Sequence, residues 1–386
     1  MSVTAAHGFR AAGVGAGLKS SGLLDVGLVV NDGPLYVAAG VFTSNRVKAA
    51  PVLWTQQVLA DGRVDAVVLN SGGANACTGP LGFQDTHATA EWAASELAVS
   101  ATDVAVCSTG LIGDRLPLDR LVDGVSAAVP MLSVSGADDA ARAIMTTDSV
   151  PKQAVATVEG CTDCTVGGMA KGAGMLAPGL ATMLAVLTTD AVAQPAVLDR
   201  ALRAATALTL DRVDSDGCMS TNDTVLLLAS GASGESPGEE ALVAAVTAVC
   251  ADLARQLVDD AEGASKTIAV SVQHAATEND AVTAARSVAR SNLLKCAIHG
   301  EDPNWGRVLA AVGTTDAAFE PDRLAVALNE VWVCRDGTAA EDRGKVDLSG
   351  RDVTITVDLA AGEASATVWT NDLTAAYVHE NSAYST

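Results

Sequence analysis

One stretch of the sequence constrains the rest of the chain. It runs from Gly167 to Leu184 and reads Gly-Gly-Met-Ala-Lys-Gly-Ala-Gly-Met-Leu-Ala-Pro-Gly-Leu-Ala-Thr-Met-Leu. Its first thirteen residues include five glycines and one proline. Glycine readily adopts positive φ and proline favours a bend. Such a loop can therefore adopt a backbone conformation that is unfavourable for other residues. We interpret it as a loop that places Lys171 beside a reacting group and that could strain the Ala181-Thr182 bond.

Each part of this segment also has a simpler interpretation. Thr182 alone is typical of a β-branched residue that starts a buried strand, and Lys171 alone is typical of a surface cation. Gly172 to Ala177 formally matches a dinucleotide-binding fingerprint, with alanine in its third small position. However, Pro178 falls where the helix should continue, and no apolar strand precedes the motif. A nucleotide-binding protein therefore stays a minor alternative, which a cofactor soak would test.

Composition indicates a globular protein with small-molecule partners. The chain has 386 residues, of which 49% are hydrophobic and only 3% aromatic. It can bury a sizeable core of alanine, valine and leucine, enough for two domains or one large intertwined domain. Its formal net charge of −22 argues against binding to nucleic acid or to an anionic membrane. We expect small molecules or further copies of the chain as partners.

The chain is expected to be cytoplasmic, with reduced cysteines and no metal. No run of 18 apolar residues occurs, and the segment from Met1 to His7 lacks a basic stretch followed by an apolar one. In such a chain the eight cysteines predict mostly buried thiols. Cys161-Thr162-Asp163-Cys164 is a CxxC without a second pair or a nearby histidine, which favours a hairpin turn over zinc or redox chemistry.

Hydrophobic patterning predicts strands and helices in mixed order. A turn at 31–34 joins two expected strands into a hairpin, and the end of the chain reads as a β-meander with one long turn. In the longest expected helix, leucine and valine recur at helical spacing, as in a helix that covers a sheet. The expected strands are 23–30, 35–43, 64–70, 103–107, 183–188, 224–228, 266–275, 324–333, 353–359 and 364–370, with strands on either side of 161–164, and the expected helices are 85–98, 138–144, 196–208, 239–259 and 279–290.

Polar groups at element ends supply candidate site residues. Ser108-Thr109-Gly110 follows an expected strand, where a hydroxyl and a backbone N–H can face one point, although Thr-Gly is also a common turn. The helix ending in Met145-Thr146-Thr147-Asp148 brings two hydroxyls and a carboxylate near the Lys171 loop. Asp259, Asp260 and Glu262 end the long helix where the macrodipole favours bases. Glu262 could therefore hold the ammonium group of an amino acid, although solvated acids are the commoner explanation.

The segment around Thr182 resembles the cleavage site of the ornithine acetyltransferase family, arginine-biosynthesis enzymes that cut themselves before a threonine. The resemblance extends over nearly the whole chain. The Asn-Ser-Gly-Asn-Ala-Asn block that is common in the family has Gly73 at its fourth position, a small departure. The other blocks follow one order, namely Ser108-Thr109-Gly110, Ile144-Met145-Thr146-Thr147-Asp148, the cleavage segment itself, Ser220-Thr221-Asn222-Asp223-Thr224, His299 to Arg307, and Glu380 to Thr386.

The resemblance implies a self-cleaving acetyltransferase with a threonine nucleophile. Thr182 would cut the Ala181-Thr182 bond, become a new N-terminus, and use its α-amino group as base for its own hydroxyl. The hydroxyl would then carry acetyl from N-acetylornithine to glutamate in ping-pong order. Thr109 and Gly110 match the oxyanion pair of the family. Its substrate-binding positions match Thr146, Lys171, Thr182, Glu262, Asn381 and Thr386.

The resemblance also implies the architecture and the assembly. The fold class is α/β in composition, a mixed α+β arrangement of layered sheets enclosed by helices, like that of N-terminal-nucleophile enzymes, with a β-rich region from roughly 280 to 386. Residues 1–181 and 182–386 would form intertwined α and β chains in an α2β2 heterotetramer without cofactor. The sequence leaves open whether acetyl-CoA also serves as donor and whether the pathway is a specialised one. An N-terminal-nucleophile aminopeptidase or amidohydrolase is the main alternative.

Overall fold

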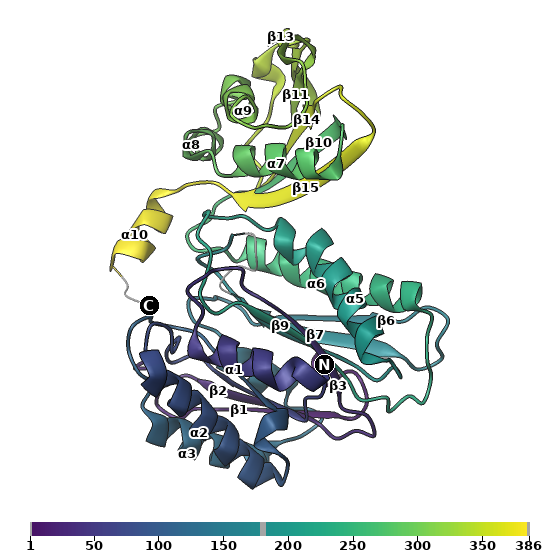
Figure 1. Cartoon of the computed structure of the whole chain (residues 1–386). Coiled ribbons are helices and arrows are strands. Elements are labelled where there is room, and N and C mark those ends of the chain that lie inside the picture. The colour runs from purple at the N-terminus through teal and green to yellow at the C-terminus, as the bar shows by residue number, and fades with distance from the viewer. Residues whose placement is uncertain (1, 178–182, 384–386) are drawn as a thin grey trace. The chain divides into compact units, whose positions relative to one another are not determined.

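The computed structural model describes residues 2–177 and 183–383, and Figure 1 labels many of their helices and strands. They form two compact units. The first contains the chain up to Asp211 together with Cys218–Leu257, and the second contains Arg212–Gly217 and the chain from Val258 onward. The predicted boundary between Ala181 and Thr182 falls within the sequence span of the first unit and stays a prediction.

Two sheets form the centre of the first unit. One has the strand order β1-β2-β4-β5 and the other the order β3-β9-β8-β7-β6. All residues of β2, β4, β5, β8 and β9 are buried, because these strands are covered on both faces. The bounds are β1 Phe9–Val14, β2 Val26–Asn31, β3 Val37–Phe42, β4 Ala66–Asn70, β5 Val104–Ser108, β6 Lys152–Thr157, β7 Thr165–Lys171, β8 Leu184–Thr189 and β9 Thr224–Ala229.

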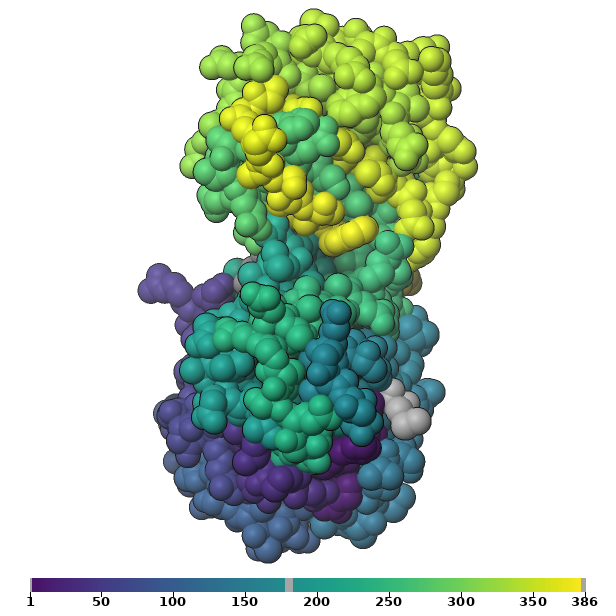
Figure 2. Space-filling model, turned by 90° about the vertical axis from the view of Figure 1, so that its right-hand side faces the viewer, coloured from purple at the N-terminus to yellow at the C-terminus, as the bar shows by residue number. Residues whose placement is uncertain are grey.

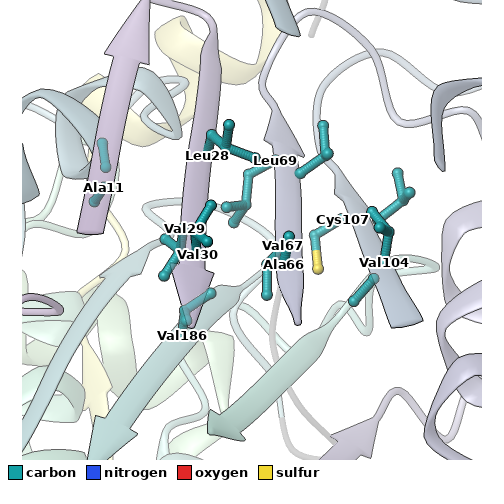
Figure 3. Close-up of a cluster of buried hydrophobic side chains, with 14 of the residues drawn as sticks. Ala11, Leu28, Val29, Val30, Ala66, Val67, Leu69, Val104, Cys107 and Val186 are labelled. Carbon is teal, nitrogen blue, oxygen red and sulfur yellow. The ribbon is translucent and has the colours of Figure 1, made fainter. Parts of the chain in front are cut away.

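A shared hydrophobic core joins these two sheets. Val29 of β2 and Val67 of β4 belong to the same buried cluster as Val186 of β8 and Leu226 of β9. Figure 3 shows part of this cluster, with side chains from the four-stranded sheet beside Val186 of the five-stranded one. The mixed α/β class with layered sheets is confirmed.

Helices pack around the two sheets (Figure 1). On the four-stranded sheet, α3 and α4 pack against β1 and β2, and α1 and α2 pack against β5. On the five-stranded sheet, α5 packs against β3 and β9, and Val249 and Leu253 of α6 lie over Gly168 of β7. The bounds are α1 Ala50–Val58, α2 Gly79–Leu97, α3 Leu118–Ala128, α4 Ala137–Ala143, α5 Pro195–Leu208 and α6 Glu239–Asp259.

Among the described residues, one helix is long and apolar enough to match the length and composition of a membrane span. This helix, α6, has a mean hydropathy of 1.6 over its most apolar stretch, half of which is buried. Its predicted apolar positions, Leu242, Val246, Val249, Leu253 and Leu257, are all buried. The helix therefore covers a sheet, as its spacing predicts.

The predicted hairpin around Asn31-Asp32-Gly33-Pro34 is wrong. β2 pairs with β1 and β4, whereas β3 pairs with β9 in the other sheet. The connection crosses between the sheets, because Asn31 N–H donates to Asp65 while Leu35 N–H donates to Ser230. Turn-forming residues mark a change of direction, but they do not determine which strands pair.

The second unit is a single sheet with helices packed against it. Its order is β13-β12-β11-β14-β10-β15, and α7 and α9 contact β10, β11 and β15. Figure 2 shows the C-terminal part of this unit, in yellow, at its surface. The bounds are β10 Thr267–Ala275, β11 Ala325–Leu328, β12 Val331–Arg335, β13 Thr338–Ala339, β14 Asp352–Asp358, β15 Ala364–Asn371, α7 Glu278–Ala289, α8 Asn292–His299, α9 Trp305–Val312 and α10 Ala375–Ala383.

The predicted C-terminal meander is also wrong. β10 lies between β14 and β15, parallel to the first and antiparallel to the second, so the last two long strands are not neighbours. The predicted strand at 324–333 is two strands, because Asn329 and Glu330 adopt positive φ and form a tight turn between β11 and β12.

The cysteines differ from the expectation of reduced, mostly buried thiols. Cys161 and Cys164 form a disulfide. The antiparallel β6–β7 pair forms the predicted hairpin, which brings their Cα atoms to 5.4 Å, within bridging distance. Of the free cysteines in the described residues, Cys107, Cys250 and Cys334 are buried and Cys77, Cys218 and Cys296 are exposed.

The contact between α4 and β1 positions the segment that carries Thr146 and Asp148, and it depends on Gly13. A Cβ atom on this residue would lie 2.0 Å from the carbonyl oxygen of Asp139 in α4. We expect Gly13→Ala to lower the free energy of unfolding by about 1–3 kcal/mol through overpacking. The matched control is Gly238→Ala, where a Cβ atom meets nothing within 4 Å. Urea titration of both variants checks this, and equal stability of the two would contradict it.

Candidate active site

The structure brings three of the predicted site residues together in the first unit. Lys171 ends β7, and its side chain is only 2% exposed. Its Nζ donates to Thr146 Oγ1 at 2.6 Å and to Thr109 Oγ1 at 3.4 Å. The interpretation of Lys171 as a surface cation is wrong, because the strand end points its ammonium into this buried cluster of hydroxyls.

Asp148 lies at the centre of the cluster. Its Oδ1 accepts from Lys152 Nζ at 2.6 Å and from Gly172 N–H at 2.7 Å, and its Oδ2 lies 3.9 Å from Lys171 Nζ. Burial alone would raise the pKa of this carboxyl, but Lys171, Lys152 and the Gly172 N–H outweigh that effect and lower it to about 2. Asp148 is therefore ionised and holds two buried ammonium groups in place.

Thr109 and Gly110 lie directly after β5, at the end of a buried strand. Thr109 N–H donates to Asn70, and its carbonyl accepts from Gly73 N–H, so this backbone is fixed. Gly110 has a φ of +129°, and a Cβ atom there would lie 2.8 Å from Gly73 N. Only glycine fits that position. Among the described residues, Gly110 N–H has no hydrogen-bond partner, so this donor and the Thr109 hydroxyl can serve a developing oxyanion.

Buried hydrogen bonds from Ser108 and Asn222 stabilise this turn. Ser108 Oγ donates to Asn70 Oδ1 at 2.5 Å. Asn222 Nδ2 donates to the carbonyl oxygens of both Ala74 and Ser108. The segment before β9 is thereby tied to the end of β5, which fixes the turn at Thr109 relative to the five-stranded sheet.

The predicted cleavage residues Ala181 and Thr182, together with Thr386, lie outside the described residues. The flanking chain is well defined. Lys171 and Leu184 are register partners in the antiparallel β7–β8 pair, and Met183 N–H donates to Asp223 Oδ1 at 3.1 Å. The segment between Gly172 and Met183 therefore begins and ends at the same place in the sheet.

In the second unit, Glu262 and Asn381 are brought together. Glu262 Oε2 accepts from Asn381 Nδ2 at 2.9 Å. The contact depends on Gly263, which has a φ of +60° and where a Cβ atom would lie 2.3 Å from Tyr377 N in α10. The bare backbone of this glycine lets the C-terminal helix approach the end of α6.

Glu262 also lines a cavity of about 190 Å³ within the second unit. Asp216 and Asp372 add two further carboxyl groups, and Lys295 is the one lysine or arginine among the described lining residues. Lys295 is almost fully buried, and burial lowers the pKa of its ammonium. With three acids against one base, the cavity suits a cationic group.

Sequence reasoning assigned no role to two buried charged residues, Lys152 in the first cluster and Asp223 beside Met183. Lys152 lies four residues after Asp148, a spacing that could have suggested an ion pair. The dinucleotide-binding interpretation is wrong. Gly172 to Ala177 follows strand β7 and contains no helix, and the next described element is another strand, β8. Across residues 2–177 and 183–383, no cluster of histidine, cysteine, aspartate or glutamate forms a metal site.

Comparisons with known proteins identify the family. The ArgJ family model matches residues 10–386. The arginine biosynthesis bifunctional protein ArgJ of Streptomyces coelicolor is 69% identical over the full length of both chains. The protein of the same name from Thermobifida fusca is 64% identical, again over both full lengths. The chain therefore belongs to the ArgJ family.

A solved structure agrees with this assignment. The crystal structure of the arginine biosynthesis bifunctional protein ArgJ from Bacillus halodurans is 32% identical, with a TM-score of 0.50. The match covers 52% of this chain and 98% of that chain. The chain in that crystal is thus about half as long as this one.

The Asp148 cluster makes a prediction about stability. Asp148→Asn keeps the shape of the side chain but removes the negative charge that faces two buried ammonium groups. We expect a loss of about 3–5 kcal/mol of unfolding free energy at pH 7, the usual effect of breaking a buried ion pair. Because the folded-state pKa lies below the ordinary value, this contribution is complete above about pH 4 and is lost as the pH falls toward 2.

Urea titrations at pH 7 and at stepwise lower pH measure this difference. The matched control is Asp138→Asn, which removes an exposed pair with Arg142 and should change stability by less than about 1 kcal/mol. If Asp148→Asn lowered the free energy of unfolding at pH 7 no more than this control does, the charge of Asp148 would not stabilise the fold.

Proposed function

We propose that this protein is a self-cleaving acetyltransferase that moves acetyl from N2-acetylornithine to glutamate through an acetyl ester on Thr182. The products are ornithine and N-acetylglutamate, in arginine biosynthesis. The proposal rests on the ArgJ family membership and on one structural observation. Lys171, which ends the strand before the segment containing Ala181 and Thr182, forms a polar cluster with Thr146 and Thr109.

Self-cleavage and transfer would use the same hydroxyl. Thr182 Oγ attacks the Ala181 carbonyl, the peptide becomes an ester, and water releases Ala181 as a carboxylate. The new α-amino group of Thr182 has a reference pKa of about 7.7–8.0, so part of it is neutral near physiological pH and can act as a base. The half-length chain of the Bacillus halodurans protein supports such processing.

The acyl-transfer steps follow from the donors around the cluster. Thr182 Oγ attacks the acetyl carbonyl, and the Thr109 hydroxyl with the Gly110 N–H stabilises the oxyanion. Lys171 would bind a substrate carboxylate, assisted by Thr146, because its ammonium group lies within hydrogen-bond distance of the Thr146 and Thr109 hydroxyls in a buried polar cluster. Glu262 would hold the substrate ammonium, with Asn381 and Thr386 as further substrate contacts. Deacylation by the amine of glutamate reverses the same steps.

The assembly and the cell compartment belong to the same proposal. The two products of cleavage would remain together as an α2β2 heterotetramer, and the enzyme would work in the cytoplasm on small molecules without a cofactor. Acetyl-CoA is a second donor to test, because the relatives are named bifunctional. Incubating the enzyme with glutamate and either N-acetylornithine or acetyl-CoA, followed by chromatography of N-acetylglutamate, separates one activity from two.

The function predicts that one substitution abolishes two activities. Thr182→Ala should leave an intact chain on denaturing gels and no transfer of acetyl from N-acetylornithine, because both steps need the hydroxyl. The wild-type chain should give two fragments, the second beginning Thr-Met-Leu-Ala. Thr157→Ala, at an exposed position of β6, should behave as the wild type does. A fully active, uncut wild-type chain would refute the proposal.

The oxyanion assignment predicts a large loss of turnover. Removing one positioned donor usually costs roughly 3–4 kcal/mol in the transition state, so Thr109→Ala should lower kcat of the processed enzyme about 100-fold or more. Thr102→Ala, an exposed hydroxyl shortly before the same strand, is the control and should keep wild-type kcat. If the two variants turned over equally while both stayed folded, residues 108–110 would be only a turn.

A further inference from the structure

A buried carboxylate in the second unit, that of Asp372, holds the segment that follows Glu262. Asp372 directly follows β15, and its side chain is fully buried. Its Oδ1 accepts from the N–H groups of Ser265 at 2.9 Å and of Lys266 at 2.8 Å, and its Oδ2 accepts from Ser265 Oγ. These hydrogen bonds fix the chain between Glu262 and the start of β10 to the end of β15.

A further donor to this carboxylate comes from a distant part of the chain. His299 ends α8, and its Nδ1 lies 2.8 Å from Asp372 Oδ2. Burial alone would raise the pKa of Asp372, but the hydrogen bonds from Ser265, Lys266 N–H and His299 outweigh that effect and lower it. The ionised carboxylate has no proton to donate, so His299 Nδ1 carries the hydrogen. His299 begins the sequence block that ends at Arg307, a block that has no role in the mechanism proposed above.

The same segment is also tied to the C-terminal helix. Thr374, two residues after Asp372, donates through Oγ1 to the carbonyl of Gly263 at 2.6 Å. The same hydroxyl accepts from Tyr377 N–H in α10 at 2.9 Å. The turn between β15 and α10 therefore holds the backbone directly after Glu262 at two places.

Glu262 and Asp372 line the same cavity of about 190 Å³, but they suit different roles. Four donors already face the two oxygens of Asp372, about as many as a carboxylate accepts. Asp372 is therefore a support, and Glu262 is the acid that would hold a substrate ammonium. In N2-acetylornithine the α-nitrogen is an amide, so its ammonium is the one on the side chain. Glutamate has no side-chain ammonium.

We infer that His299 and Asp372 are positioning residues that orient Glu262 toward the side-chain ammonium of N2-acetylornithine. The inference rests on the proposed function. His299 holds the Asp372 carboxylate in one orientation, and Asp372 holds the backbone that carries Glu262. The pair thereby sets the affinity for the acetyl donor, and it takes no part in making or breaking bonds.

The decisive variant is His299→Ala, because this side chain is 44% exposed and its removal should leave the unit folded. We expect the KM for N2-acetylornithine to rise about 10-fold or more, since a hydrogen bond to a charged group usually contributes at least that factor to an equilibrium constant. The value of kcat and the KM for glutamate should stay as in the wild type. His299→Asn, whose amide N–H can replace the Nδ1 hydrogen, should recover part of the affinity.

Calorimetric titration of the processed enzyme measures the same effect without turnover. The probes are ornithine and norvaline, which has the same carbon chain but lacks the side-chain ammonium. The preference of the wild type for ornithine should shrink about 10-fold in His299→Ala, by the same hydrogen-bond estimate. Ser265→Ala, which removes the hydroxyl donor to Asp372, should also reduce it.

The matched control is His274→Ala. It removes a second histidine–aspartate pair of the same unit, because His274 Nδ1 lies 2.8 Å from Asp358 Oδ2 and its side chain is 51% exposed. This pair lies near the end of β10 that is farther along the chain from Glu262. The control should keep both KM values and the preference for ornithine.

Two outcomes would overturn the inference. One is a folded His299→Ala enzyme with the wild-type KM for N2-acetylornithine and the wild-type preference for ornithine. The other is an equal rise of both KM values, or the same loss in His274→Ala, either of which would make the pair structural only. A wild-type enzyme that neither transfers acetyl nor binds ornithine would instead refute the proposed function.

Discussion

The site depends on one buried carboxylate, Asp148. It joins three separate parts of the chain, the segment after α4, strand β6 through Lys152, and the end of β7 through Lys171 and Gly172. A buried ammonium group is unfavourable in a folded protein unless a counter-charge compensates it. Asp148 provides such a charge to both Lys152 and Lys171, and it thereby stabilises the end of β7 from which Lys171 projects.

A buried aspartate accepts a hydrogen bond at each end of the connection from Gly172 to Met183. At its start, Asp148 accepts from Gly172 N–H, and at its end, Asp223 accepts from Met183 N–H. Asp148 lies close to two ammonium groups. Asp223 Oδ2, in contrast, has no hydrogen-bond partner within the described structure. The β7–β8 register fixes both ends of this connection in the sheet. The surrounding sheets supply that rigidity.

Small residues make this rigidity possible. With few aromatic side chains, the sheets and helices pack through close backbone approach rather than through bulky groups. A Cβ atom on Gly167 would lie 1.9 Å from the carbonyl oxygen of Ser2, and one on Gly263 would meet the backbone of α10. These two glycines allow different contacts. Gly167 holds the N-terminal segment against β7, and Gly263 lets Asn381 reach Glu262.

The sequence alone determined the local features of this protein. Apolar spacing predicted α5, α6, β8 and β9, because that signal is carried by neighbouring residues. The family resemblance implied that Thr109, Thr146 and Lys171 belong to one site. Only the tertiary structure decided that β2 and β3 lie in different sheets, that β10 separates β14 from β15, and that Lys152 joins the cluster. Strand pairing and buried charge pairing depend on which distant segments of the chain pack against each other. That packing is determined by the need to bury both faces of each sheet, which local sequence does not reveal.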